Sequence, residues 1–511
     1  MHRFKSELDE GQIHLRDRLQ FELKSDFSPQ PMKRRNIFTQ EFYIFVPNAL
    51  QINRNTYSKE QFYHDCTNFI RYKTPRFQLK ALISFNNPRS PLTRLKALSS
   101  TSLTPKDIAT IEDELKLFGN IVRSAVRKKT RKLVNRLLSP EMLQLSQTFN
   151  DEVFSFINDL QQLREAFSSL QEDFSQHFSI DTIKQHFLYV NTFINNAIDY
   201  HLTGLLYMLH QGRFNKSTSL EKALKNMISP QPTPLLQKTQ KKMTDSSLAN
   251  EYFLYQRGLL NKFVMDALLL NVSRTASQQR YFPIIGALAA GIAMLLYLLV
   301  FIWQGTIFVI NSTPFVVIMV ITYIIKDRIK EGLRSLYHRE ASRWLSDFIT
   351  EIRTPDGEKS IGKLKEIFSF VDEEKLPAEI IAVRNKEFHT ILETFKRPET
   401  VIYYKKEVNL KGTTRPVGAR RHQLNNIFRF NIHRFLEKAS DPYHKYLAID
   451  PSNDELQEKQ LPKVYHVNVI MRNSYVESDG ATKIELQKFR LIIDKEGIKR
   501  IEQVNPPTQN L

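Results

Sequence analysis

The sequence contains a single cysteine, Cys66, among its 511 residues. One cysteine cannot form an intramolecular disulfide, a CxxC redox pair or a zinc site made of several thiolates, and this usage is typical of a reducing compartment. The first residues, Met1 to Ile13, also lack an apolar stretch of signal-peptide length. We therefore expect any membrane-targeting segment to lie inside the chain.

Motifs of common enzyme classes are missing as well. The sequence has no GxSxG, HExxH or GxGxxG motif, which removes the usual anchors of hydrolases, zinc proteases and dinucleotide-binding proteins. Gly357, Gly362 and Lys363 have the spacing of a P-loop, but Leu364 stands where that loop needs Ser or Thr for Mg²⁺. We interpret the segment as an exposed turn, predict no cofactor and no metal site, and favour a non-enzymatic protein.

Charge is absent from one long segment, because no Asp, Glu, Lys, Arg or His occurs between Arg280 and Lys326. About 20 helical residues cross the hydrocarbon core of a bilayer, so this segment predicts two transmembrane helices, at 283–303 and 306–326. The turn between them stays open between Gln304 and Pro314. Basic residues on both sides of the segment place both flanks and both termini in the cytoplasm by the positive-inside rule. The expected location is the inner membrane of a bacterial cell.

A long antiparallel helical bundle is predicted over residues 101–228. Apolar residues recur at alternating steps of four and three, which keeps them on one seam of a helix and is typical of coiled coils. The clearest seam consists of Phe149, Val153, Phe156, Leu160, Leu163, Phe167, Leu170 and Phe174. Such a bundle also offers a surface for self-association or for a protein partner.

Basic residues dominate the formal charge of +19, and they concentrate between residues 51 and 136, where 18 basic residues stand against 6 acidic ones. The densest stretch closes a predicted helix and consists of Arg123, Arg127, Lys128, Lys129, Arg131, Lys132 and Arg136. A solvated helix face is the simplest interpretation. The alternative is a footprint on anionic lipid headgroups, where each cation contributes about 1 kcal/mol. Nucleic acid is the less favoured partner, because no DNA- or RNA-binding motif accompanies the charges.

The rest of the chain is divided by composition. We expect a polar, flexible N-terminus at 1–36, a small α+β segment at 37–100, a Pro- and Lys-rich linker at 229–245, a helix at 246–280, an amphipathic helix at 327–354, a linker at 355–375 and an α+β domain at 376–511.

A polar stripe is predicted within the last domain, on a helix from Arg421 to Lys438. His422, Arg429 and His433 fall on one face at helical spacing. These three residues are the candidate catalytic groups for a reaction on a phosphate ester or a nucleic acid. A solvated helix face explains the same pattern.

Together these features predict a multidomain membrane protein with an N-terminal helical bundle, a two-helix transmembrane hairpin and a C-terminal α+β domain. The function expected first is a non-enzymatic scaffold, adaptor or sensor that holds basic surfaces against anionic lipid or an acidic partner. A membrane-disrupting or pore-forming effector and a membrane-tethered enzyme are the alternatives.

Overall fold

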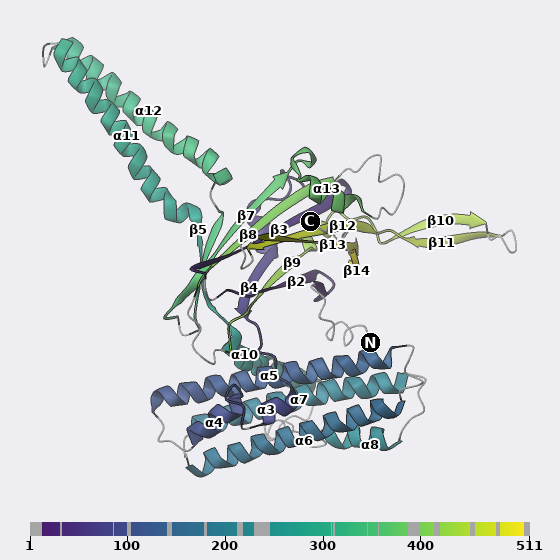
Figure 1. The fold of residues 1–511 in the computed structure, drawn as a ribbon. Coiled ribbons are helices and arrows are strands. Elements are labelled where there is room, and N and C mark those ends of the chain that lie inside the picture. The colour runs from purple at the N-terminus through teal and green to yellow at the C-terminus, as the bar shows by residue number, and fades with distance from the viewer. Residues whose placement is uncertain are drawn as a thin grey trace.

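The computed structural model describes residues 13–30, 33–84, 86–99, 104–139, 146–177, 181–211, 218–228, 246–307, 309, 312–344, 346–355, 357–386, 399–412, 420–449, 455–476 and 481–504. The predicted linker at 229–245 and the first 12 residues of the predicted flexible N-terminus lie outside this part of the chain. Within it, a body of two β-sheets stands on a bundle of long helices, and a helical arm projects from the body on the side away from the bundle (Figure 1).

The larger sheet has eight antiparallel strands in the order β14-β13-β12-β3-β8-β7-β6-β5. Strand β3, from the N-terminal part of the chain, lies near its centre, with Phe42 opposite Tyr404 of β8 on one side and Met471 of β12 on the other. The strands are β3 (Arg35–Pro47), β5 (Asn271–Ala276), β6 (Phe348–Arg353), β7 (Ser360–Val371), β8 (Glu399–Lys411), β12 (Tyr465–Val476), β13 (Thr482–Asp494) and β14 (Gly497–Val504).

A second sheet of four strands, in the order β1-β2-β9-β4, packs against one face of the large sheet. Its strands are β1 (Ile13–Leu15), β2 (Gln20–Phe27), β4 (Cys66–Tyr72) and β9 (Leu424–Asn431). Aromatic rings fill the space between the sheets; Phe42 of β3 stacks on Phe428 of β9 with 4.3 Å between ring centroids. Because side chains alternate along each strand, the other face of this small sheet is left for polar and charged residues.

The predicted fold class is wrong in two respects, and the first concerns the sheets. The N-terminal α+β segment at 37–100 and the C-terminal α+β domain at 376–511 are not separate, since β3 lies between β8 and β12 and β9 lies between β2 and β4. These pairings join strands several hundred residues apart. Periodicity within a short window identifies a strand but not its partner, so the sequence pattern could not reveal the shared sheets.

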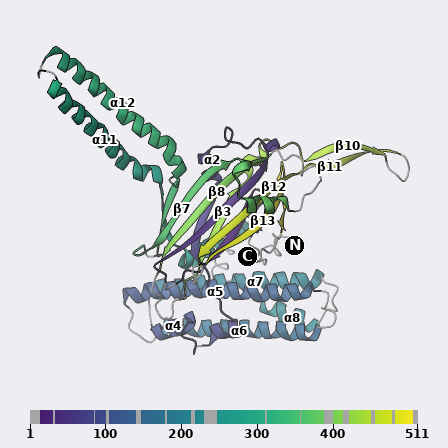
Figure 2. The same ribbon diagram turned by 45° about the horizontal axis from the view of Figure 1, so that its top comes forward.

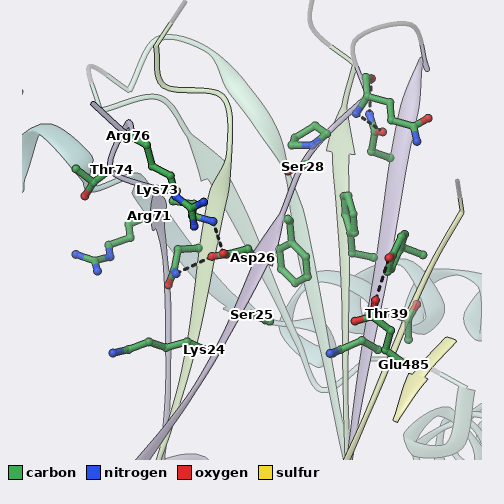
Figure 3. A pocket seen from close by; sticks show the side chains of 18 of the residues that line it. Lys24, Ser25, Asp26, Ser28, Thr39, Arg71, Lys73, Thr74, Arg76 and Glu485 are labelled. Atoms are coloured by element: carbon green, nitrogen blue, oxygen red, sulfur yellow. Dashed lines mark hydrogen bonds and ion pairs between the residues drawn. The ribbon is translucent and has the colours of Figure 1, made fainter. Parts of the chain in front are cut away.

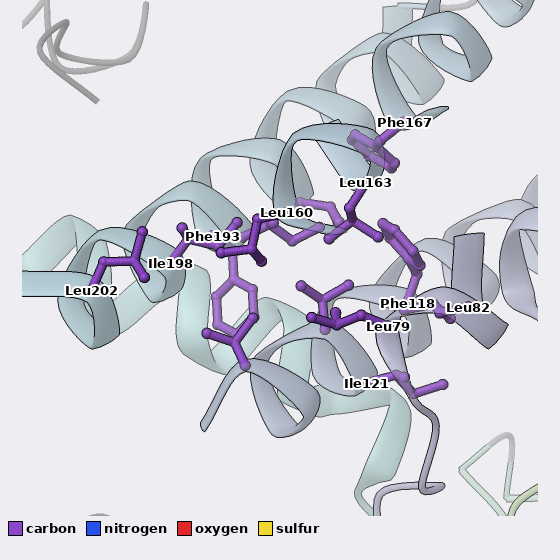
Figure 4. Close-up of a cluster of buried hydrophobic side chains, with 14 of the residues drawn as sticks. Leu79, Leu82, Phe118, Ile121, Leu160, Leu163, Phe167, Phe193, Ile198 and Leu202 are labelled. Carbon is purple, nitrogen blue, oxygen red and sulfur yellow. The ribbon is translucent and has the colours of Figure 1, made fainter. Parts of the chain in front are cut away.

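The helical bundle is built from α3 (Leu79–Ile83), α4 (Pro91–Ser99), α5 (Pro105–Leu137), α6 (Ser146–His177), α7 (Asp181–Gln211), α8 (Thr218–Met227) and α10 (Ser246–Met265). The seam of α6 is buried, from Phe149 to Phe174. Its side chains pack among those of α3, α5 and α7 (Figure 4), and Phe167 stacks on Phe118 of α5 with 5.1 Å between centroids. The seam therefore serves a core shared by several helices rather than a two-stranded coiled coil.

Ion pairs fix the bundle to the sheets. Arg421, just before β9, donates to Asp113 of α5 at 2.9 Å and to the carbonyl oxygen of Ala267 at 2.7 Å. Within the bundle, Lys116, one turn further along α5, donates to Asp266, directly after α10, at 2.9 Å. Helix α5 is thus held with one face on the bundle core and another towards the small sheet, as Figure 2 shows from a second side.

The second correction to the fold class concerns the arm, which consists of α11 (Ser277–Ile307) and α12 (Thr313–Trp344). Among the described residues, one helical segment, Gly286–Ile307 of α11, is long and apolar enough to cross a membrane, a criterion of length and composition alone. Helix α12 starts at Thr313, so only the 13 residues up to Ile325 precede Lys326, against about 20 for a span. The predicted transmembrane hairpin is therefore wrong, and so is the classification as a two-span transmembrane protein.

Three further segments differ from expectation. The predicted amphipathic helix at 327–354 is helical only to Trp344 and then becomes β6, and the predicted linker at 355–375 contains β7. Strand β9 occupies eight of the 18 residues predicted as a helix from Arg421 to Lys438, and only α15 (His433–Leu436) is helical there. The buried residues of β9, including Phe428 and Phe430, fit both a helical and an alternating pattern. Pairing with the neighbouring strands decides in favour of the strand.

The P-loop-like segment lies at the start of β7. Gly357 adopts the left-handed conformation of a turn, with φ of 77°. Gly362 is inside the strand opposite Leu410, and a Cβ at this position would collide with the backbone of β8. The second glycine is thus explained by close approach of two strands.

Two smaller elements complete the body. Helix α13 (Ala378–Asn385) packs on the outer face of the large sheet, and strands β10 (Tyr443–Ile449) and β11 (Leu456–Pro462) form a separate hairpin that extends from the body (Figure 1).

Candidate anion-binding site

A cavity of about 1210 Å³ lies between the small sheet, the ends of β3 and β12 in the large sheet, and helix α5. Strands β2 and β4 supply one wall, and the close-up in Figure 3 shows Lys24, Asp26, Arg71, Lys73 and Arg76 along it. Helix α5 supplies the opposite wall through Arg123, Arg127 and Lys128.

The lining is strongly cationic. Among its described residues, nine are Lys or Arg and two, Asp26 and Glu485, are acidic. The nine are Lys24, Lys33, Arg35, Arg71, Lys73, Arg76, Arg123, Arg127 and Lys128. Asp26 is itself engaged, because it accepts from Lys73 and, at 2.9 Å, from Asn425. An excess of cations around one concave space focuses a positive potential and attracts anions.

Local structure explains how these residues converge. Along β2, Leu23 points into the core between the sheets, so Lys24 points away from it towards the bundle. Arg71 does the same on β4, next to buried Ile70. On α5, Arg123 and Arg127 are one turn apart and share a face, whereas Val122 and Val126 are buried in the bundle.

The guanidinium of Arg123 forms no ion pair with a described carboxylate. Its Nη1 donates to Asn261 Oδ1 at 3.2 Å, and its guanidinium lies 5.3 Å from the ring centroid of Phe193. No described carboxylate lies within ion-pairing distance of it. Burial, followed by repulsion from Arg71, Arg127 and Arg257, lowers the pKa of Arg123 to about 10. The folded protein therefore holds this cation at a cost in free energy.

Arg71 and Lys24, on the opposite wall of the cavity, are also cations whose charged form is disfavoured by burial and by repulsion from other cations. The buried Nε of Arg71 has no hydrogen-bond partner among the described residues, and burial lowers the pKa of this side chain. Burial also lowers the pKa of Lys24, against the attraction of Glu22 at 3.9 Å and with repulsion from Arg127 and Arg71. Cations that repel one another across a cavity favour the binding of an anion between them.

A second lobe of about 450 Å³ adjoins the first and shares His14, Lys24, Arg123 and Arg127 with it. Its other walls come from α7 and α10, with Tyr200, His201 and Arg257. The Arg257 guanidinium lies 4.9 Å from the ring centroid of Tyr200. Burial, with repulsion from Arg127, Arg123 and Arg257, lowers the pKa of His201 to about 4, so this histidine is neutral at pH 7.

The basic residues at the end of α5, predicted from the sequence as one surface, fall into two groups in the structure. Arg123, Arg127 and Lys128 line the cavity, whereas Lys129, Lys132 and Arg136 contact Glu152 of α6 at 2.8, 3.0 and 2.6 Å. Burial alone would raise the pKa of Glu152, but the three cations outweigh it and lower the pKa to about 2. Arg131 is partly buried on the same helix. Contact of the whole stretch with an anionic surface stays a prediction, and three of its seven residues hold α5 to α6.

The predicted stripe of His422, Arg429 and His433 is not brought together. Arg429 lies on β9 and pairs with Glu22 of β2 at 2.6 Å, His422 precedes the strand, and exposed His433 follows it at the start of α15. Residues at steps of four and three share a face of a helix but not of a strand. These residues thus do not form a common site.

Sequence reasoning found the α5 side of the cavity and missed Lys24, Arg71 and the second lobe. The available signal was the alternation in β2 and β4, but it does not reveal which helix those strands face. In the part of the chain that the structure describes, no group of three or more His, Cys, Asp or Glu residues could hold a metal ion. Comparison of the chain with family models, curated proteins and solved structures returns no match. The site is therefore interpreted from its own chemistry.

Proposed function

We propose that the protein is a non-enzymatic adaptor or sensor that binds a polyanionic ligand in the cavity between its helical bundle and its sheets. The observation that carries the proposal is the excess of cations around the cavity, above all Arg71 and Arg123, for which no ion pair with a described carboxylate is found. A bound anion would replace their mutual repulsion with charge-assisted hydrogen bonds, each contributing about 1.5–3 kcal/mol. Binding would also fasten the sheets to α5, since the two walls of the cavity belong to these two parts.

Association with a lipid bilayer is proposed for α11. This helix exposes apolar side chains on most of its surface, for example Leu295, Leu299 and Ile302. Strands β5 and β6 pair at its base, so the chain enters and leaves the arm at one place on the body. We propose the cytoplasmic face of a bacterial inner membrane as the location, supported by Lys326, Arg328 and Lys330 on the segment that returns to the body. Retention in the membrane fraction through a high-salt wash would support this placement.

The arm leaves the body on the side away from the bundle (Figures 1 and 2), whereas the cavity lies between the sheets and helix α5 of the bundle. If α11 enters a bilayer, the headgroups of that bilayer are far from α5. We therefore propose a soluble anion as the ligand of the cavity, in place of an anionic lipid surface. Of the other functions expected from the sequence, the tethered enzyme relied on the His422 stripe, which is dispersed, and no described feature favours a pore-forming effector.

The test is calorimetric titration of the full-length protein in detergent with inorganic tripolyphosphate. We expect binding that weakens as the salt concentration rises, because both partners are highly charged. Arg71→Gln should weaken it by about 10-fold or more, corresponding to one lost charged hydrogen bond. Arg500→Gln is the matched control, since Arg500 is exposed on β14 and away from the cavity. Absence of binding, or equal losses in the two variants, would contradict the proposal.

A further inference from the structure

The two lobes of the cavity share a wall, and both are cationic. Nine Lys and Arg residues line the larger lobe, and five line the smaller one. In the smaller lobe the cations stand beside two aromatic residues, Phe193 and Tyr200, and the amides of Asn196 and Asn261. A ligand that fills both lobes therefore needs a strongly anionic part joined to a planar part with hydrogen-bonding edges.

We propose that the two lobes form one binding site for a nucleoside polyphosphate, with the phosphates in the larger lobe and the base in the smaller one. This inference rests on the proposed function, because it names the class of anion that the cavity takes. It adds a requirement for the ring, which simple anion binding does not have.

The phosphate end is supported by two arginines of the larger lobe that come from different walls. Guanidinium groups match phosphate oxygens with two parallel hydrogen bonds. Arg71 approaches the cavity from β4 and Arg123 from α5, so a phosphate chain between them would be held from two sides. Lys24, which belongs to both lobes, adds a third cation at the passage from one lobe to the other.

The base end is supported by the smaller lobe. Its volume of about 450 Å³ falls within the range of about 300–1,000 Å³ that is usual for small-molecule sites. The ring of Tyr200, with Arg257 over it at 4.9 Å, provides the kind of flat surface on which bases stack. Asparagine amides supply both a donor and an acceptor for the edge of a base.

Position favours a small soluble ligand over a polymer or a membrane. The smaller lobe is lined by α5, α7 and α10 on one side and by the start of the small sheet, His14 to Arg16, on the other. A nucleotide can enter such a space as a separate molecule. A bilayer surface cannot, and the arm points away from this end (Figure 1).

The experiment compares ATP and GTP with inorganic tripolyphosphate by calorimetry on the full-length protein. We expect at least one nucleotide to bind about 10-fold more tightly than tripolyphosphate, a difference equivalent to one stacked base. Tyr200→Ala should remove this difference and leave tripolyphosphate binding unchanged, whereas Arg71→Gln should weaken all three ligands. Tyr446→Ala is the matched control, because Tyr446 is exposed on the separate β10–β11 hairpin.

The outcomes separate this inference from the proposed function. If tripolyphosphate binds as tightly as both nucleotides, or if Tyr200→Ala weakens all ligands equally, the nucleotide assignment is overturned while anion binding stands. If no ligand binds, both are overturned. Tighter binding of single-stranded RNA than of either nucleotide would also overturn the assignment. Should Tyr200→Ala fail to show the thermal transition of the wild type, Asn196→Ala tests the same lobe.

Discussion

Replacing Arg123 by methionine should stabilise the protein without ligand and weaken its binding of polyanions. Methionine keeps an unbranched, mainly apolar side chain but loses the guanidinium over Phe193, and with it a cation that the fold holds under repulsion. Lowering the pKa from 12.5 to about 10 corresponds to a cost of about 3 kcal/mol at neutral pH. Residual solvent contact reduces that figure, and the lost hydrogen bond to Asn261 offsets about 1 kcal/mol. We expect a net gain of about 1 kcal/mol.

Scanning calorimetry at low salt measures this effect. A gain of about 1 kcal/mol should raise the midpoint of the transition that contains the bundle by roughly 2–4 °C. The difference should shrink at high salt, because screening relieves the wild-type repulsion. Saturating tripolyphosphate should reverse the order, since a ligand stabilises the form that binds it. Arg500→Met, the control, should change little. If Arg123→Met is less stable than wild type at low salt while the control is unchanged, the account of Arg123 as a buried cation repelled by its neighbours is refuted.

Two other predictions concern the bundle. The pKa of His201 is lowered to about 4 in the folded protein. As the pH falls, this histidine is therefore protonated in the unfolded chain before it is protonated in the folded one. The contribution of neutral His201 to the free energy of unfolding is full above about pH 6.5 and is lost on going down to about pH 4. His201→Gln should flatten that part of the pH dependence of the unfolding midpoint, and an unchanged slope would contradict the assignment. Phe156→Asp should unfold the bundle, because it places a charge in a position that is 1% exposed, at a cost of several kcal/mol. Gln161→Asp, on the exposed side of α6, should leave the helical circular dichroism unchanged, and similar losses in both variants would contradict the seam.

Features set by neighbouring residues could be read from the sequence, and features set by distant residues could not. The start of α5 at Pro105 follows from Thr104 as a cap and a proline in the first turn, and both are found there. The buried seam of α6 follows from its spacing. The length of α12 depends instead on where the turn after α11 ends. Whether the residues of β9 form a strand or a helix depends on their pairing with β2 and β4.

The candidate site shows the same limit. Arg123 and Arg127 stand out as part of a basic helix, but a surface helix and a cavity wall have the same sequence pattern. Lys24 and Arg71 are ordinary residues of two short strands. They become part of a site only because β9, more than 350 residues after β4, brings the small sheet together beside α5. No signal within either strand encodes that neighbour.

The central position of β3 has a consequence for how the protein is made. Glu41 of this strand accepts hydrogen bonds from Tyr403 and Arg472, which follow it by 362 and 431 residues. At roughly 5–20 residues per second, a ribosome needs about 20–90 s to supply the second of these partners. The helices of the bundle pack on one another and are complete by Met265, and α11 follows at once. During synthesis β3 therefore waits as an unpaired, aromatic-rich strand while the bundle folds and α11 emerges, and this interval is when the chain is most exposed to aggregation or in need of a chaperone.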